Sequence, residues 1–250
     1  MKERPILFSP PMVRALLRDV NPKTQTRRIV KFPLLSKSDG AKRRVYLEKD
    51  TDEINTYIAM RQRNPMVSGL CPLGQIGDRL WVREAWRVGK KHDKLSGKEI
   101  WEHLEKSKGQ GVTVLYEVGG WKSVSPFKRI ETIYSNDEGM PSWAGRKRIG
   151  RFMPRWASRI TLEITNVHIQ RVQEISEEDA VAEGIDWAEN DFGNGPSYCD
   201  YGIKNREDTA EWFASPIDSF RSLWDSINGN LHPWSDNNWV WAITFRKLEE

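Results

Sequence analysis

Cysteine is scarce in this 250-residue chain, with only Cys71 and Cys199 present. These two residues lie far apart, and the sequence contains no CxxC motif, no HExxH motif and no Cys and His spacing typical of structural zinc. We therefore expect neither a metal nor another cofactor. Two free thiols are typical of a protein in a reducing cytoplasm.

Long apolar runs are also missing. No window approaches the roughly 18 consecutive apolar residues of a membrane-spanning helix. The N-terminal stretch MKERPILFSP has no long apolar core, which argues against a signal peptide. We expect a cytoplasmic protein with no membrane partner, and the sequence carries no signal for an oligomeric state.

The composition is that of a globular protein, with 38% apolar and 30% charged residues. The net charge is only +4, but basic residues are locally dense, first in KTQTRR and later between Arg146 and Arg159. Such clusters attract phosphates if they share a face, and are otherwise solvated loop charge. The 12 tryptophans either fill a loop-covered core or offer stacking platforms for bases.

Start and stop signals mark three helices. Ser9-Pro10 and Ser215-Pro216 are N-cap pairs, and Ser176 with Asp179 resembles a capping box. Alternating apolar residues mark the strands. The sequence predicts helices at 10–19, 176–183 and 216–228, core strands at 78–86, 159–170 and 238–247, and a further strand at 112–118.

Strands that do not alternate with helices argue against a doubly wound sheet and favour a mainly β, α+β fold, a mixed β-barrel flanked by helices. We expect one domain over residues 1–250. Three charged or turn-rich segments, 36–70, 89–150 and 188–214, are interpreted as insertions. Loops of this length are usually lids, binding loops or disordered.

The motifs resemble those of a known family when taken in order along the chain. They are KERPILFSPPMVRALL, KTQTRR, CPLGQIGDRLWVREAW, MPRWASRITLEITNV, ISEEDAVAEGI, LWDSING and PWSDNNWVWAITF. Together they resemble the ASCH-domain proteins of bacteria and prophages, within the PUA-like superfamily. No single motif is specific, but their order and spacing are.

The resemblance implies a PUA-like barrel with a cleft beside a helix, and a link to RNA binding and base modification. Small bacterial members are amidohydrolases that remove the acetyl group of N4-acetylcytidine with a Lys, a Thr and a Glu. By that match Lys23 and Thr26 carry over from the KTQT run, and Glu183, more loosely, from the end of the AVAEG helix. This chain is far longer than those members, and its extra loops put the substrate in question.

The residue types suit amide hydrolysis. Thr26 supplies a hydroxyl, which needs a base to become a nucleophile. Lys23 becomes such a base if burial and the neighbouring Arg27 and Arg28 lower its pKa. Glu183 then orients water or protonates the leaving amine. The alternatives are a solvated strand entry for the turn, and a solvated residue or an ion-pair partner of Arg27 for Glu183.

Glu84 is a second candidate carboxylate, in WVREAW between two tryptophans. Among aromatic rings its pKa would rise, which suits a general acid or a contact to a base edge. The alternative is an ion pair with Arg83 or Arg159. We also expect Trp81, Ser158 and Arg159 to contact the substrate, together with Arg27 and Arg28. The four histidines form no recognisable pair in the sequence.

Two functional hypotheses follow. The first is an amidohydrolase that acts on an acylated pyrimidine nucleoside. The second is a non-catalytic module that binds RNA or single-stranded DNA, or a ribonuclease using the same groove. A binder needs only positive charge at Lys23, whereas a hydrolase needs a titratable amine.

Overall fold

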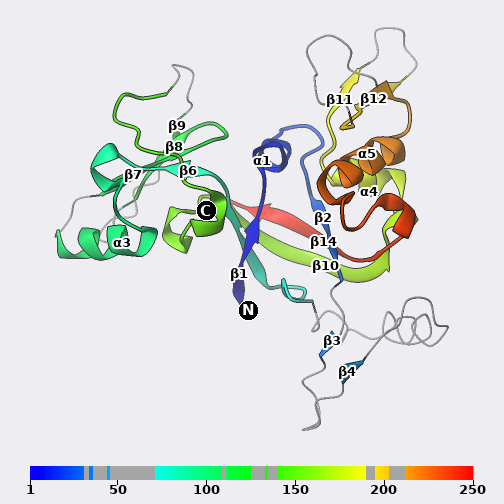
Figure 1. Ribbon diagram of the computed structural model, residues 1–250, viewed down its shortest axis with the longest axis horizontal. Coiled ribbons are helices and arrows are strands. Elements are labelled where there is room, and N and C mark those ends of the chain that lie inside the picture. Colours follow the sequence, from blue (N-terminus) through cyan, green and yellow to red (C-terminus); the bar gives the residue numbers. More distant parts are fainter. Residues whose placement is uncertain are drawn as a thin grey trace. The chain divides into compact units, whose positions relative to one another are not determined.

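A computed structural model of the chain describes residues 1–30, 71–107, 111–124, 140–189, 195–202 and 212–249. It also describes the backbone of three short strands, β3 (Leu34–Leu35), β4 (Arg44–Val45) and β9 (Ile133–Tyr134). These residues have mixed α and β structure, with more residues in strands than in helices (Figure 1). The chain divides into two compact units. The first unit comprises Met1–Lys2, Ala15–Asp78 and Glu163–Arg246, and the second unit comprises Glu3–Arg14, Arg79–Leu162 and Lys247–Glu250.

The sheet of the first unit has the strand order β10 (Thr161–Arg171), β14 (Trp239–Leu248) and β2 (Gln25–Ile29). Strands β14 and β2 are antiparallel, with Thr26 opposite Ile243. In β14, Val240 to Ile243 are all buried, so both faces of this strand are covered. A strand covered on both faces tolerates apolar side chains at consecutive positions, which explains the near-continuous apolar run.

Two helices pack together in the first unit, α4 (Glu177–Ala182) and α5 (Pro216–Asn228) (Figure 1). Phe220 and Trp224 of α5 belong to a buried cluster with Ala180 of α4 and Val240 of β14. Each helix begins at a serine whose hydroxyl oxygen accepts a backbone N–H. A three-stranded sheet follows α4, formed by β11 (Trp187–Glu189), β12 (Pro196–Cys199) and β13 (Trp212–Phe213).

The second unit pairs β1 (Glu3–Leu7) with β5 (Arg79–Arg83) in parallel. A separate antiparallel sheet runs β6 (Trp86–Arg87), β7 (Val112–Tyr116), β8 (Trp121–Val124) and β9. Helix α3 (Gly97–Lys106) contributes Ile100 and Leu104 to a core shared with Trp86 and Val114. The unit therefore has an apolar core of its own.

The predicted helices and strands are largely confirmed. Helix α5 has the predicted bounds, while α1 (Pro10–Leu16) and α4 are shorter than predicted. The long strand predicted at 159–170 is β10, where two adjacent exposed residues, Thr165 and Asn166, mark the change of inward-facing phase. The predicted strand 78–86 is divided into β5 and β6, and the strand expected at 112–118 is β7, which begins as predicted but ends at Tyr116.

The structure differs from the expectation in two respects. No sheet formed by the described strands closes into a barrel. The segment 89–150, interpreted as an inserted loop, contains α3, β7 and β8, because its apolar residues recur with helical and then alternating spacing. Most of the insertion predicted at 36–70, and parts of the one at 188–214, lie outside the described residues. The assignment of a single domain stays a prediction.

Candidate active site

The KTQT run follows α1 and includes the first two residues of β2, and its backbone is hydrogen bonded to three parts of the first unit. The amide of Lys23 donates to the carbonyl of Ala15 at 3.0 Å, and the amide of Thr24 donates to Ala182 of α4 at 2.9 Å. The carbonyl of Thr24 accepts from the amide of Phe245 in β14 at 2.8 Å. The turn is thus held against the end of α4.

Lys23 and Glu183 are brought together in the protein interior. The side chain of Lys23 is 1% exposed, and its Nζ donates to the Oε2 of Glu183 at 2.8 Å and to the Glu183 carbonyl at 2.5 Å. Glu183 is the C-cap residue of α4, and Gly184 follows with φ of +82°. A Cβ at Gly184 would lie 2.8 Å from the Cβ of Lys23, so only glycine fits both the backbone and the space.

Arg27 joins the same cluster through two carboxylates of α4. Its Nη2 donates to Asp179 at 2.7 Å and its Nη1 to the Oε1 of Glu183 at 3.2 Å. The Gln25 side chain contacts both a cation and a carboxylate of this cluster. Its oxygen accepts from Arg27 at 2.6 Å and its nitrogen donates to Asp179 at 2.8 Å. Two cations thus meet two carboxylates here, and Arg28 also acts on Glu183 through its charge. The alternative interpretation of Glu183 as an ion-pair partner of Arg27 is confirmed.

Thr26 is completely buried, and its Oγ1 has no hydrogen-bond partner among the described residues. Thr26 lies between Gln25 and Arg27 on β2, whose side chains reach α4, and alternation along a strand directs Thr26 to the other face. The ammonium of Lys23 is therefore not hydrogen bonded to the Thr26 hydroxyl in this state. A buried hydroxyl without a partner is costly, so this group calls for an explanation.

Burial lowers the pKa of Lys23 below its ordinary value of 10.5, and Arg28 and Arg27 lower it further. Glu183 opposes them through its charge and its hydrogen bond. We regard burial as the dominant effect, since Lys23 lies in a low-dielectric interior beside two guanidinium groups. The contact between Nζ and Oε2 then allows a proton to pass between the amine and the carboxylate.

Glu84, in the second unit, forms a buried bidentate ion pair with Arg159. The two hydrogen bonds measure 2.9 and 3.0 Å. Arg159 also lies 4.1 Å from the centre of the Tyr116 ring. Burial raises the pKa of Glu84, and the hydrogen bonds and charge of Arg159 oppose that rise. The alternative of an ion pair with Arg159 is confirmed for this carboxylate.

Ser158 and Trp81 also have structural partners. The Ser158 hydroxyl donates to the carbonyl of Val82 in β5 at 2.8 Å. Trp81 is buried and lies against the guanidinium of Arg83, 4.7 Å from its ring centre. These contacts account for both side chains without a ligand.

The predicted site residues thus fall into two groups. Lys23, Thr26, Glu183 and the two arginines belong to the first unit, whereas Glu84, Trp81, Ser158 and Arg159 belong to the second. The prediction that Glu84 lies near Lys23 stays a prediction.

Asp179 was not predicted as a site residue, although the sequence contains a signal for it. It precedes Glu183 by four residues, a spacing that places both carboxylates on one face of α4. The helix thereby presents two acidic groups to a cationic strand. That strand begins within the KTQTRR run, where basic residues are dense.

The basic stretch 146–159 is only partly available to a ligand. The guanidinium of Arg148 donates to the carbonyls of Leu95 and His92 at 2.8 and 2.7 Å, and Arg159 is held by Glu84. Arg146, Lys147 and Arg151 remain exposed. Counting charges along the sequence therefore overestimates the free cations of this stretch.

No helix within the described ranges is long and apolar enough to cross a membrane. The same residues contain no group of three or more His, Cys, Asp or Glu that could hold a metal ion. Comparison with family models, with curated proteins and with solved structures found no match to this chain.

Proposed function

We propose that the protein is an amidohydrolase that removes an acyl group from an acylated pyrimidine nucleoside such as N4-acetylcytidine. The observation that carries the proposal is the buried Lys23–Glu183 pair, a titratable amine of lowered pKa in contact with a carboxylate. The resemblance of the motifs to ASCH-domain proteins supports the same reaction. The PUA-like assignment belongs to this proposal and rests on the order of the motifs.

The reaction proceeds in two steps. Lys23 takes the proton of the Thr26 hydroxyl as the Oγ1 attacks the acyl carbon, and the C–N bond then breaks. The leaving amine takes a proton from the Lys23–Glu183 pair, and water afterwards hydrolyses the acyl-threonine to free acid. Because the Thr26 side chain lies on the face of β2 opposite to those of Gln25 and Arg27, the start of β2 has to rearrange on substrate binding to bring Oγ1 within hydrogen-bond distance of Nζ.

The experiment is to incubate the purified full chain with N4-acetylcytidine and with other N-acylated nucleosides, and to separate the products by chromatography. We expect release of cytidine, or of the corresponding parent nucleoside, together with an equal amount of the free acid. If the protein cleaves no member of this panel, the hydrolase assignment has no support.

A second candidate function is binding of RNA or single-stranded DNA, with or without cleavage. The segment 140–152 favours it, because it contains both exposed apolar and exposed basic side chains. The apolar ones are Met140, Trp143, Ile149 and Phe152, and the basic ones are Arg146, Lys147 and Arg151. Bases stack on exposed aromatic rings while cations contact the phosphates.

For this second function we expect the substitution of Arg146, Lys147 and Arg151 by glutamine to weaken binding of a labelled single-stranded oligonucleotide. The log–log salt slope should fall by about 0.7 for each phosphate that the variant no longer neutralises. Fluorescence anisotropy at several salt concentrations measures it. The matched control replaces three exposed lysines of the same unit, Lys94, Lys98 and Lys106, and equal weakening in both triple variants would argue against this surface.

A further inference from the structure

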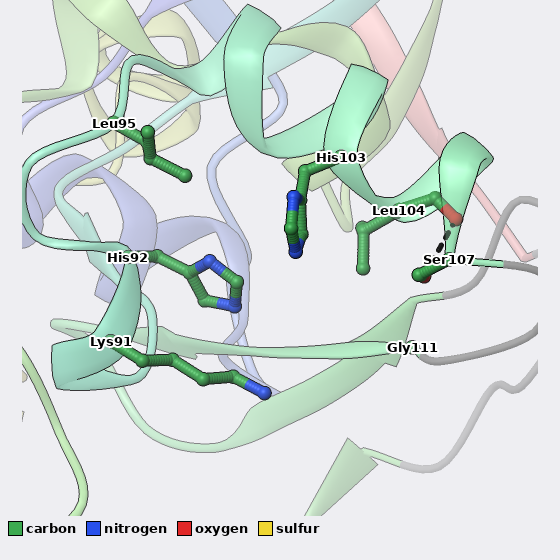
Figure 2. Close-up of a pocket in the computed structure, with 7 residues that line it drawn as sticks. All are labelled: Lys91, His92, Leu95, His103, Leu104, Ser107 and Gly111. Carbon is green, nitrogen blue, oxygen red and sulfur yellow. Dashed lines mark hydrogen bonds between the residues drawn. The ribbon is translucent and has the colours of Figure 1, made fainter.

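A small pocket lies in the second unit, between the 3-10 turn η2 (Lys90–His92) and the end of α3. Its volume is about 190 Å³. A water molecule occupies roughly 30 Å³ in the liquid, so the pocket has room for a polyatomic ion. Figure 2 shows side chains from both elements directed into it. The lining residues are Lys91, His92, Leu95, His103, Leu104, Ser107 and Gly111.

His92 is the buried polar group of this pocket. Its side chain is only 4% exposed, and its Nε2 has no hydrogen-bond partner within the described ranges. The ring lies near that of His103 in a T-shaped arrangement, with the two centres 6.3 Å apart (Figure 2). An unpaired buried nitrogen costs free energy unless a ligand or water satisfies it, so the site favours a hydrogen-bonding occupant.

The charged groups around His92 are mainly cationic. Lys91 is the preceding residue and lines the pocket, and the Arg148 guanidinium donates to the His92 carbonyl at 2.7 Å. Asp93 is the acidic neighbour, and its Oδ1 accepts from the backbone amide of Arg146 at 2.9 Å. The carbonyl end of α3 opposes an anion, but a helix terminus carries only about half a charge.

Ser107 does not add a donor. Its hydroxyl donates to the carbonyl of Leu104 at 2.9 Å, as the dashed line in Figure 2 shows. The donors left for an occupant are therefore Nε2 of His92, the Lys91 ammonium and the His103 ring. A metal ion is a poorer fit, because the pocket supplies only two imidazoles and the Lys91 ammonium repels a cation.

We propose that this pocket binds a tetrahedral oxyanion, a phosphate or sulfate group, through the Nε2 proton of His92 and the ammonium of Lys91. His103 closes the site from the opposite side as a third donor. Charge-assisted hydrogen bonds of this kind are short and about twice as strong as neutral ones. The proposal concerns residues that the candidate active site does not use, so it stands independently of the proposed hydrolase.

Binding of the anion is coupled to proton uptake. In the free protein burial lowers the pKa of His92, and Lys91, His103 and Arg148 lower it further, while Asp93 opposes them. A bound anion stabilises the imidazolium and raises that pKa. Affinity therefore increases as the pH falls through the pKa of the complex, and it levels off below the pKa of the free protein.

The test is a titration of the full chain with sulfate, which does not change its own charge between about pH 4 and pH 9. Imidazole resonances are followed by NMR, with chloride at equal ionic strength as the reference. We expect sulfate to raise the titration midpoint of His92. Lys91→Met should weaken sulfate binding about 30-fold at low ionic strength, the effect of one lysine charge about 4 Å from a dianion in water. The matched control Lys94→Met removes an exposed lysine that does not line the pocket and should bind as wild type.

Equal midpoints in sulfate and chloride would overturn the proposal, as would equal weakening in the two lysine variants. His92→Gln serves only to assign the resonance, and the lysine comparison remains decisive if that variant fails to fold, because Lys91 is exposed. Inorganic phosphate and a nucleoside 5′-monophosphate distinguish the source of the oxyanion. Tighter binding of the nucleotide assigns the pocket to a phosphate ester, and equal binding assigns it to a free oxyanion.

Discussion

Replacement of Lys23 by methionine is expected to slow hydrolysis of N4-acetylcytidine by about 10²–10⁴-fold, the usual contribution of a general base. Methionine fills a similar volume without a titratable amine, which matters at a position 1% exposed. Lys23→Arg keeps the charge but not the base, and should be as inactive. If Lys23→Arg hydrolysed N4-acetylcytidine as fast as wild type, the mechanism would be contradicted. A protein that only binds phosphate, in contrast, would tolerate arginine at this position.

The same experiment tests whether Lys23 and Thr26 act as a unit. Thr26→Ala should lower kcat/KM about as much as the Lys23→Met, Thr26→Ala double variant does, because a nucleophile without its base is inactive. Thr26→Ser keeps a hydroxyl and should retain part of the rate. Lys98→Arg is the matched control, since Lys98 is an exposed lysine paired with Glu102 at 3.6 Å, and it should leave kcat/KM unchanged.

The pH dependence of kcat/KM provides an independent test. The free enzyme needs Lys23 in its neutral form, so the rate should rise with pH and level off above the pKa of this amine. Because burial lowers that pKa, the plateau should begin below the ordinary value of 10.5. A profile that still rises through pH 10.5 would mean that Lys23 titrates as an ordinary solvent-exposed amine.

Glu183→Gln is expected to lower the free energy of unfolding by about 3–5 kcal/mol, since it removes one partner of a buried ion pair. Arg27 keeps its ion pair with Asp179 at 2.7 Å, whereas Lys23 loses the carboxylate that lies 2.8 Å from its Nζ. Chemical denaturation at constant pH measures the change. Glu163→Gln is the matched control, because Glu163 pairs with a mostly exposed Arg246, and it should cost less than about 1 kcal/mol.

The double variant Lys23→Met, Glu183→Gln should recover much of the stability that Glu183→Gln removes. Removing both charges leaves no unpaired ion from this pair in the interior, so the two changes are strongly non-additive. Additive destabilisation would show that Glu183 stabilises the fold through other contacts. Activity should not recover in the double variant, which separates the structural role of the pair from its proposed catalytic role.

Local signals along the chain predicted much of the secondary structure. Ser215, Pro216 and Gly229 bound α5 as predicted, because N-caps, N1 prolines and terminal glycines act within one helical turn. Helix α3 was missed although Ser96 and Glu99 form a capping box. Its high charge suggested a loop, but Ile100 and Leu104 are buried in the core and Trp101 packs against it.

The candidate site was less predictable, because its partners are distant in sequence. Lys23 and Glu183 are 160 residues apart, and the family resemblance, not spacing, suggested their pairing. Composition alone also does not reveal that Arg148 and Arg159 are engaged by buried partners. Those assignments depend on which carbonyl or carboxylate the fold places beside each guanidinium.

Because the partners of the KTQT turn are distant in sequence, its contacts form late during synthesis of the chain. The turn leaves the ribosome early, but Glu183 follows 160 residues behind Lys23, a delay of roughly 8–32 seconds at ordinary elongation rates. The hydrogen bond from the amide of Phe245 to the carbonyl of Thr24 forms later still. During that interval the nascent chain carries a cationic turn without its carboxylates, and a chain released before β14 lacks the strand against which β2 pairs.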